Sequence, residues 1–268
     1  MSRQFTRHVA RLAGPLAGLV LSAAVGVAPA LAAPAPDSRA GVAGAAQTEQ
    51  FAGRIQCAAA WRKAHAEPTV ENYKAVGLCE IDRRLATIDR LGNGVADARA
   101  LTDDHQAALQ RILDRSAAGL RSLRAEIEAD TTVPELRGDI TGIFEDFRIY
   151  ALVTPQVSLV IGADTVEAAG AALDDTAVDL ATLIARAEAA GKDVAEAKAH
   201  LAAMEAAIDE ALDGVDGVAV AVLPLTPADW NAGLAGPILR KARQAIADAR
   251  ADLRTAKAEA RQVIAALP

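Results

Sequence analysis

The sequence is poor in aromatic residues, cysteine and histidine. Aromatic residues make up 3% of its 268 residues, and it has two cysteines and four histidines. So few bulky side chains exclude a core built on aromatic packing, and the abundant alanine favours helices that approach each other closely. Hydrophobic residues still reach 52% against 24% charged. The composition therefore predicts a folded chain rather than a disordered one.

Recognisable catalytic and cofactor-binding motifs are also missing. The sequence has no HExxH, GxSxG, P-loop or GxGxxG pattern. A di-iron site in a helical bundle needs Glu-x-x-His pairs, but none of His65, His105 and His200 has a glutamate three residues before it. We interpret these histidines as surface or capping residues, and we expect no cofactor, no metal site and no enzyme.

The first 32 residues have the pattern of a signal peptide. Arg3, Arg7 and Arg11 precede an apolar run over residues 16–28, and Ala30–Ala32 provides the small-x-small motif that signal peptidase recognises. The apolar run is shorter than the roughly 20 residues of a spanning helix, although a membrane anchor is the alternative. We expect cleavage after residue 32 and a secreted or cell-envelope protein without a stable membrane span.

Charge narrows the choice of partners. Cleavage after residue 32 removes three arginines and no acidic residue, so the formal net charge moves from −7 to −10. An acidic protein is repelled by phosphate polymers and anionic membrane surfaces, which argues against nucleic acid as a partner. Residues 33–46 consist largely of Ala, Pro and Gly, which predicts a flexible linker.

The two cysteines are predicted to form a disulfide. Cys57 and Cys79 lie eleven residues to either side of Pro68. If residues 51–65 and 70–98 are helices folded back on each other at the proline, the two thiols lie opposite each other. Export supplies an oxidising compartment. A metal-binding or catalytic pair is the alternative, but no CxxC spacing supports it.

Apolar residues recur in steps of three and four along most of the mature chain, which predicts an all-α fold. We expect an elongated antiparallel bundle with coiled-coil-like seams. It would consist of an N-terminal helical lobe over residues 47–153 and a three-helix lobe over residues 154–268. The final helix alternates large residues with alanine at its seam positions, so the preceding helix should pack closely against it. Such long seams also allow a homodimer.

The phase of the apolar stripe changes near Thr154 and Pro155, which suit an N-cap and a first helical residue. Extending the stripe of residues 134–153 past this point puts it two residues, or about 200°, out of step with the stripe that follows. The chain therefore either forms one kinked helix or reverses at Pro155. Residues 217–223 resemble a strand by valine content, but their register continues that of the preceding helix, so we predict helix.

Arg148 is the most distinctive polar residue, since it lies in an otherwise apolar turn. A guanidinium there needs a carboxylate, for which Glu145 and Asp164 are the candidates. An internal ion pair that fixes helix register is the first interpretation. A ligand site is the second, and its candidate residues form a polar cluster of Arg148, Tyr150, Gln156 and Asp164. Plain solvent exposure is the third.

The signal peptide, the early cysteine pair and the segment FEDFRIYALVTPQ together resemble a group of uncharacterised Ala-rich exported helical proteins of high-GC Gram-positive bacteria. The resemblance implies an extracellular helical bundle and brings no activity or site residues with it. We expect a non-enzymatic scaffold or binding protein whose partner is a protein or an envelope component. The alternative is a membrane-active protein of the pore-forming type, and an enzyme of unrecognised type is the third hypothesis.

Overall fold

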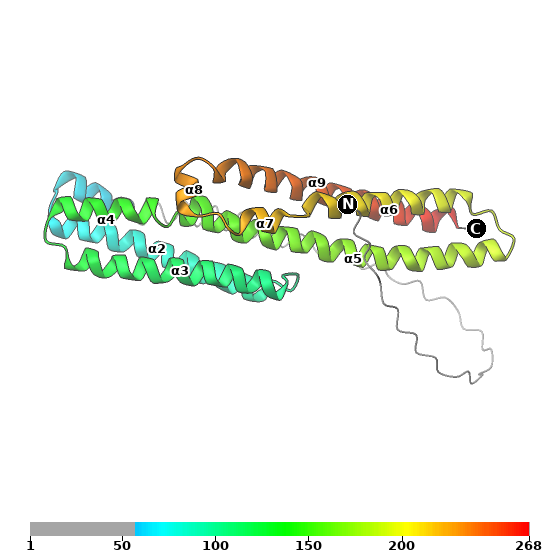
Figure 1. Cartoon of the computed structure of the whole chain (residues 1–268), viewed down its shortest axis with the longest axis horizontal. Helices are drawn as coiled ribbons and strands as arrows, with labels where there is room; N and C mark the ends of the chain where they lie inside the picture. The colour runs from blue at the N-terminus through cyan, green and yellow to red at the C-terminus, as the bar shows by residue number, and fades with distance from the viewer. Residues whose placement is uncertain (1–56, 268) are drawn as a thin grey trace, which may run out of the picture. The chain divides into compact units, whose positions relative to one another are not determined.

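The computed structural model describes residues 57–267, and these residues form helices with no strand among them (Figure 1). The predicted all-α helical bundle is therefore confirmed. The predicted signal peptide (1–32) and linker (33–46) lie outside the described residues. After a helical segment over residues 57–66, the elements are α2 (Val70–Asp97), α3 (Asp103–Ala129), α4 (Val133–Glu145), the π-helix η1 (Ile149–Val153), α5 (Thr154–Ala189), α6 (Ala195–Val215), α7 (Val218–Val222), α8 (Pro227–Asn231) and α9 (Ala235–Ala266).

The first group of helices, α2, α3 and α4, is set by threonine caps and apolar stripes. Thr69, Thr102 and Thr132 each accept a backbone N–H with their side chains at the start of a helix, which satisfies an N–H that has no partner inside the helix. The apolar stripe of α3 is buried, at Leu109, Leu113, Leu120, Leu123 and Ile127, and α3 packs against α2 and α4.

The second group consists of α5, α6 and α9. Most of the predicted seam of α9 is buried, at Leu239, Ala242, Ile246, Ala249, Ala256, Ala260 and Val263. Its other two positions, Leu253 and Leu267, are partly buried. The most extensive partner of α9 is α6, as the alternation of large residues and alanine predicted. These seam positions are occupied by helices of the same chain, and the homodimer stays a prediction.

The disulfide between Cys57 and Cys79 is present, with the two Cα atoms 5.8 Å apart. The chain folds back at residues 67–69, as the position of Pro68 predicted. The bridge therefore holds helical segment 57–66 against α2.

The central helix does not reverse at Pro155. The chain runs on in the same direction from α4 through η1 into α5 (Figure 1). The helix is interrupted before the proline, at residues 146–148, where Arg148 adopts a left-handed backbone conformation. The wide turns of η1 follow, directly before the proline. A proline ring collides with the carbonyl four residues back in a regular helix, and a π-turn there relieves the collision.

Thr154 is not the N-cap that the sequence predicted. It already has helical backbone angles, and its hydroxyl donates to the carbonyl of Ile149 at 2.9 Å. The two apolar registers instead overlap in the first half of α5, which is buried on several faces at once, at Gln156, Val157, Leu159, Val160, Gly162, Ala163, Asp164 and Val166.

Residues 218–222 are helical, which confirms the preference for helix over strand. They form the separate helix α7, however, because Gly217 takes a left-handed conformation with φ of 75° and ends the continuity with α6. Val218 and Val222 are buried, as the helical register predicted.

Apolar side chains form two clusters. The larger runs from α2, α3 and α4 into the first half of α5, α7 and the first half of α9. The smaller joins the far parts of α5, α6 and α9. The division into lobes at residues 153 and 154 stays a prediction.

Candidate functional site

A half-open pocket lies between α3, the η1 turn and the loop that connects α7 to α8. We call it the α3–η1 pocket. Its volume is about 350 Å³, at the lower end of the range of about 300–1,000 Å³ for small-molecule sites. Its apolar lining comes from all three segments and includes Ala108, Ile112, Phe147, Leu152, Val153, Leu223, Pro224, Leu225 and Pro227.

Two sets of hydrogen bonds fix the loop that forms one wall of this pocket. The buried side-chain amide of Gln156 donates to the carbonyl oxygens of Val222 and Leu225, at 3.0 and 2.9 Å. Thr226 and Asp229 form a capping box at the start of α8, and hydrogen bonds from Thr226 lower the pKa of the Asp229 carboxyl. The wall is therefore shaped before any ligand arrives.

Two arginines stand at the mouth of the pocket. Arg111 and Arg115 both line it and are both exposed, one helical turn apart on α3. No salt bridge or hydrogen bond joins either side chain to a carboxylate in residues 57–267. Asp146 also lines the pocket, but its Oδ2 lies back over Gly142, 3.0 Å from the position of an added Cβ. Like charges four residues apart on a helix repel each other, and neither guanidinium is held by an ion pair within the described residues.

The predicted polar cluster does not converge on one site. The Nε of Arg148 donates to Asn231 in α8 at 2.7 Å, while Asp164 binds partners on α3. The predicted ion pair of Arg148 with Glu145 or Asp164 is therefore wrong. The side chain of Arg148 is partly exposed, so water also solvates its charge. It therefore does not need a carboxylate, and the amide oxygen of Asn231 accepts its hydrogen bond.

Asp164 instead fastens the start of α3 to α5. Its carboxylate is buried, accepts the backbone N–H of Thr102 at 2.9 Å and lies 2.8 Å from Nδ1 of His105. A carboxylate at a helix N-terminus also interacts favourably with the helix dipole. His105 was interpreted as a surface or capping residue, and it lies at the capped end of α3.

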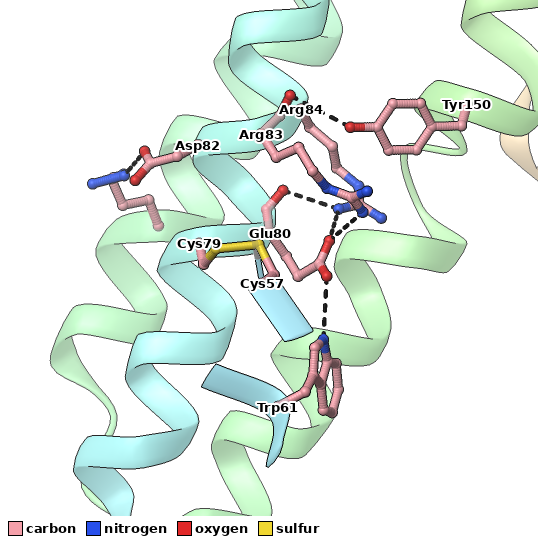
Figure 2. Close-up of a disulfide and its surroundings, with 9 residues drawn as sticks. Cys57, Trp61, Cys79, Glu80, Asp82, Arg83, Arg84 and Tyr150 are labelled. Atoms are coloured by element: carbon pink, nitrogen blue, oxygen red, sulfur yellow. Dashed lines mark hydrogen bonds and ion pairs between the residues drawn. A yellow bond between two sulfur atoms is a disulfide. The ribbon is translucent and has the colours of Figure 1, made fainter. Parts of the chain in front are cut away.

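Tyr150 belongs to a different cluster, next to the disulfide. Figure 2 shows Glu80 between Trp61 and two arginines: the indole N–H donates to it at 3.2 Å, and Arg83 and Arg84 each donate at 2.6 Å. Tyr150 reaches this cluster from η1, and its ring lies against both guanidinium groups.

Glu80 and Arg84 are both buried in this cluster. Burial raises the pKa of Glu80, but the hydrogen bonds and charges of Arg84 and Arg83 outweigh it, so the pKa lies below its usual value. Burial lowers the pKa of Arg84, opposed by its hydrogen bond to Glu80, and the ring of Phe144 covers the guanidinium with 4.4 Å between its Cζ and the ring centroid. A buried pair with this many partners is a structural element of the N-terminal group of helices.

Sequence reasoning missed Arg111 and Arg115. The signal available was two like charges four residues apart on α3, a spacing that weakens an isolated helix slightly. Many surface helices tolerate such a pair, so the spacing alone did not distinguish it. The pocket beside it comes from residues 146–156 and 223–227, which only the folded chain brings together.

Two further features bear on function. No group of three or more His, Cys, Asp or Glu side chains within residues 57–267 is arranged to hold a metal ion. The helical segment Val133–Ala189, which residues 146–148 interrupt, is long and apolar enough to cross a membrane by length and composition, and 61% of its most apolar window is buried in the bundle. Core helices of soluble proteins have the same properties.

Comparison of the chain with known protein families, curated proteins and solved structures finds no match.

Proposed function

We propose that this protein is a non-enzymatic binding protein of the cell envelope or extracellular space, and that the α3–η1 pocket is its binding site. The observation that supports the proposal most is the pair of exposed, unpaired arginines beside an apolar hollow. The other polar groups described above, at Glu80, Arg148, Gln156 and Asp164, are bound to neighbouring elements of the fold.

Two further features agree with this proposal. The first residues read as a signal peptide, and the disulfide is of a kind that persists in oxidising compartments. The resemblance to Ala-rich exported helical proteins supports the same location outside the cytoplasm. Cleavage after residue 32 is part of the proposal, and N-terminal sequencing of protein recovered outside the cytoplasm should begin at Ala33.

Native mass spectrometry of the protein from its producing cells tests the binding function. Wild-type protein should carry a non-covalent adduct, and Ala108→Trp should lose it, because the new indole fills the pocket from its half-buried rim. An adduct retained equally by both proteins would place the binding elsewhere. Wild-type protein with no adduct and no partner would contradict the proposal.

A membrane-active protein is the second candidate, supported by the length and hydropathy of the interrupted helical segment Val133–Ala189. To insert, the helix would have to leave the bundle and expose the buried carboxylate of Asp164 and amide of Gln156 to lipid, which is unfavourable. Dye release from liposomes decides between the two functions. Binding without release at any pH supports our proposal, and release at nanomolar protein favours insertion.

A further inference from the structure

The chemical class of the ligand that fits the α3–η1 pocket can be inferred from the pocket's lining, because its wall is apolar and its mouth is positively charged. The wall is mostly hydrocarbon: Leu152 and Val153 are buried, and Ile112, Phe147, Leu223 and Leu225 are partly buried. The buried amide of Gln156 also lines it, and this amide donates to carbonyl groups of the wall itself. Such a surface gains free energy when an apolar group displaces water from it. The occupant therefore has an apolar part.

Other arginines of the described chain either have a polar partner or, like Arg121, lie exposed away from this pocket, whereas Arg111 and Arg115 are both exposed and both line it. Arg84 has Glu80, Arg124 has Asp82, Arg137 has the hydroxyl of Tyr73, and Arg148 has Asn231. Arg111 and Arg115 have no such partner among the described contacts, although the protein carries a net charge of −7. An anionic group bound between them would relieve their repulsion and accept hydrogen bonds from both.

The size of the pocket limits the apolar part. A volume of about 350 Å³ holds roughly a dozen water-sized groups at about 30 Å³ each. That corresponds to an unbranched chain of about ten carbons with its head group at the mouth. Two full-length acyl chains of a bilayer lipid would not fit.

We propose that the α3–η1 pocket binds a single-chain anionic amphiphile, a carboxylate or phosphate monoester on an apolar chain of about ten carbons. Arg111 and Arg115 bind the head group, and the hollow formed by α3, η1 and residues 223–227 binds the chain. This inference rests on the proposed binding function and specifies its ligand.

Titration calorimetry with soluble probes below their micelle concentrations tests the ligand class. Decanoate should bind at least tenfold more tightly than decanol, and decyltrimethylammonium should not bind. Between hexanoate and decanoate, each added methylene should raise affinity by up to about fourfold, and the gain should stop near the length that fills the pocket. Equal affinity for decanol and decanoate would overturn the proposed charge selectivity.

Single substitutions locate the site. Arg111→Gln and Arg115→Gln should each weaken decanoate binding about fivefold and leave decanol binding unchanged. Arg121→Gln is the matched control, because Arg121 is an exposed arginine of the same helix outside this pocket, and it should bind decanoate like the wild type. An equal loss in all three variants would show general charge attraction and overturn the assignment. Unfolding curves of each variant exclude loss of fold as the cause.

The results separate this inference from the function on which it rests. If Ala108→Trp abolishes the native adduct but the arginine substitutions change nothing, the pocket binds a ligand of another class and the inference fails alone. If anionic vesicles bind in an arginine-dependent way and decanoate does not, the arginines serve a membrane surface and the inference fails. If Ala108→Trp retains both the adduct and decanoate binding, both claims fail.

Discussion

At the residue scale, Glu80 and Arg84 of α2 together connect this helix to helical segment 57–66, α4 and η1. Glu80 accepts hydrogen bonds from Trp61, Arg83 and Arg84, and Arg84 in turn packs against rings of α4 and η1. The Nε atoms of Arg83 and Arg84 are buried without a hydrogen-bond partner in residues 57–267, so the ion pairs with Glu80 are what compensates the buried charge. Removal of one partner leaves the other charge without compensation.

Glu80→Gln should therefore lower the free energy of unfolding by about 3 kcal/mol, through the uncompensated charge of Arg84. The matched control is Asp89→Asn, at an exposed position of the same helix, which should change it by less than about 0.5 kcal/mol. Urea denaturation measures both. Equal effects of the two substitutions would contradict a stabilising role for the cluster.

The same residue predicts a pH dependence. The folded pKa of Glu80 lies below its unfolded value, so its contribution to stability is complete above the unfolded pKa, near 4.3. It is lost as pH falls through the lower folded pKa. Wild-type stability should therefore fall below about pH 4 more steeply than that of Glu80→Gln, as followed by urea denaturation across pH 2.5–7. Parallel curves would contradict the assignment.

The contact between Asp164 and His105 should appear as a coupling in a double-mutant cycle. Because His105 is partly exposed, we expect a coupling free energy of about 1 kcal/mol between Asp164→Asn and His105→Gln. The control cycle pairs Asp164→Asn with His65→Gln, since His65 stacks on Trp61 instead, and it should show no coupling. Equal coupling free energies in the two cycles would show that the contact between Asp164 and His105 does not stabilise the fold.

At the element scale, the break before η1 depends on Arg148 in a left-handed conformation with φ of 45°. Glycine adopts this conformation without the cost of a side chain, whereas a β-branched residue does not. Arg148→Gly should change the free energy of unfolding by less than about 1 kcal/mol, because the relief offsets the lost bond to Asn231. Arg148→Val should lower it by about 2 kcal/mol. Thermal unfolding of the two variants checks the contrast, and equal stability would contradict the strain.

Two neighbouring glycines should respond oppositely to alanine. Gly217 is left-handed at the junction of α6 and α7, so Gly217→Ala should destabilise by about 1 kcal/mol. Gly214 lies inside α6, and a Cβ there meets only ordinary contact at 3.8 Å from Ala249. Gly214→Ala should therefore stabilise by up to about 1 kcal/mol. Chemical denaturation would refute this account if both substitutions shifted stability the same way.

The predictable and unpredictable elements differ in the range of interactions that decide them. The seam of α9 follows from residues within one or two turns, so local pattern was sufficient. The phase change was visible in the sequence, but its place was not. The helix changes phase at Arg148 and η1, because the packing of Tyr150 against α2 and of Asn231 against Arg148 fixes those turns. Such contacts join residues more than sixty positions apart.

At the scale of the whole molecule, the disulfide stabilises one end without forming the proposed site. Cys57→Ser/Cys79→Ser should lower the free energy of unfolding by roughly 3 kcal/mol through the larger entropy of the unfolded chain. Decanoate affinity should change less than twofold, because the pocket is built from α3, η1 and residues 223–227. Calorimetry and urea denaturation of the variant check this, and loss of binding in a folded variant would contradict the separation.

The central claim is that the α3–η1 pocket, with Arg111 and Arg115 at its mouth, is the binding site of this protein. The most direct measurement is NMR spectroscopy of the arginine Nε–H groups and the backbone amides while decanoate is added. The signals of Arg111, Arg115, Leu223, Leu225 and Thr226 should shift together and saturate, while those of Arg121 and Arg124 stay in place. Shifts confined to the far parts of α5, α6 and α9, or no saturable shift at all, would contradict the claim.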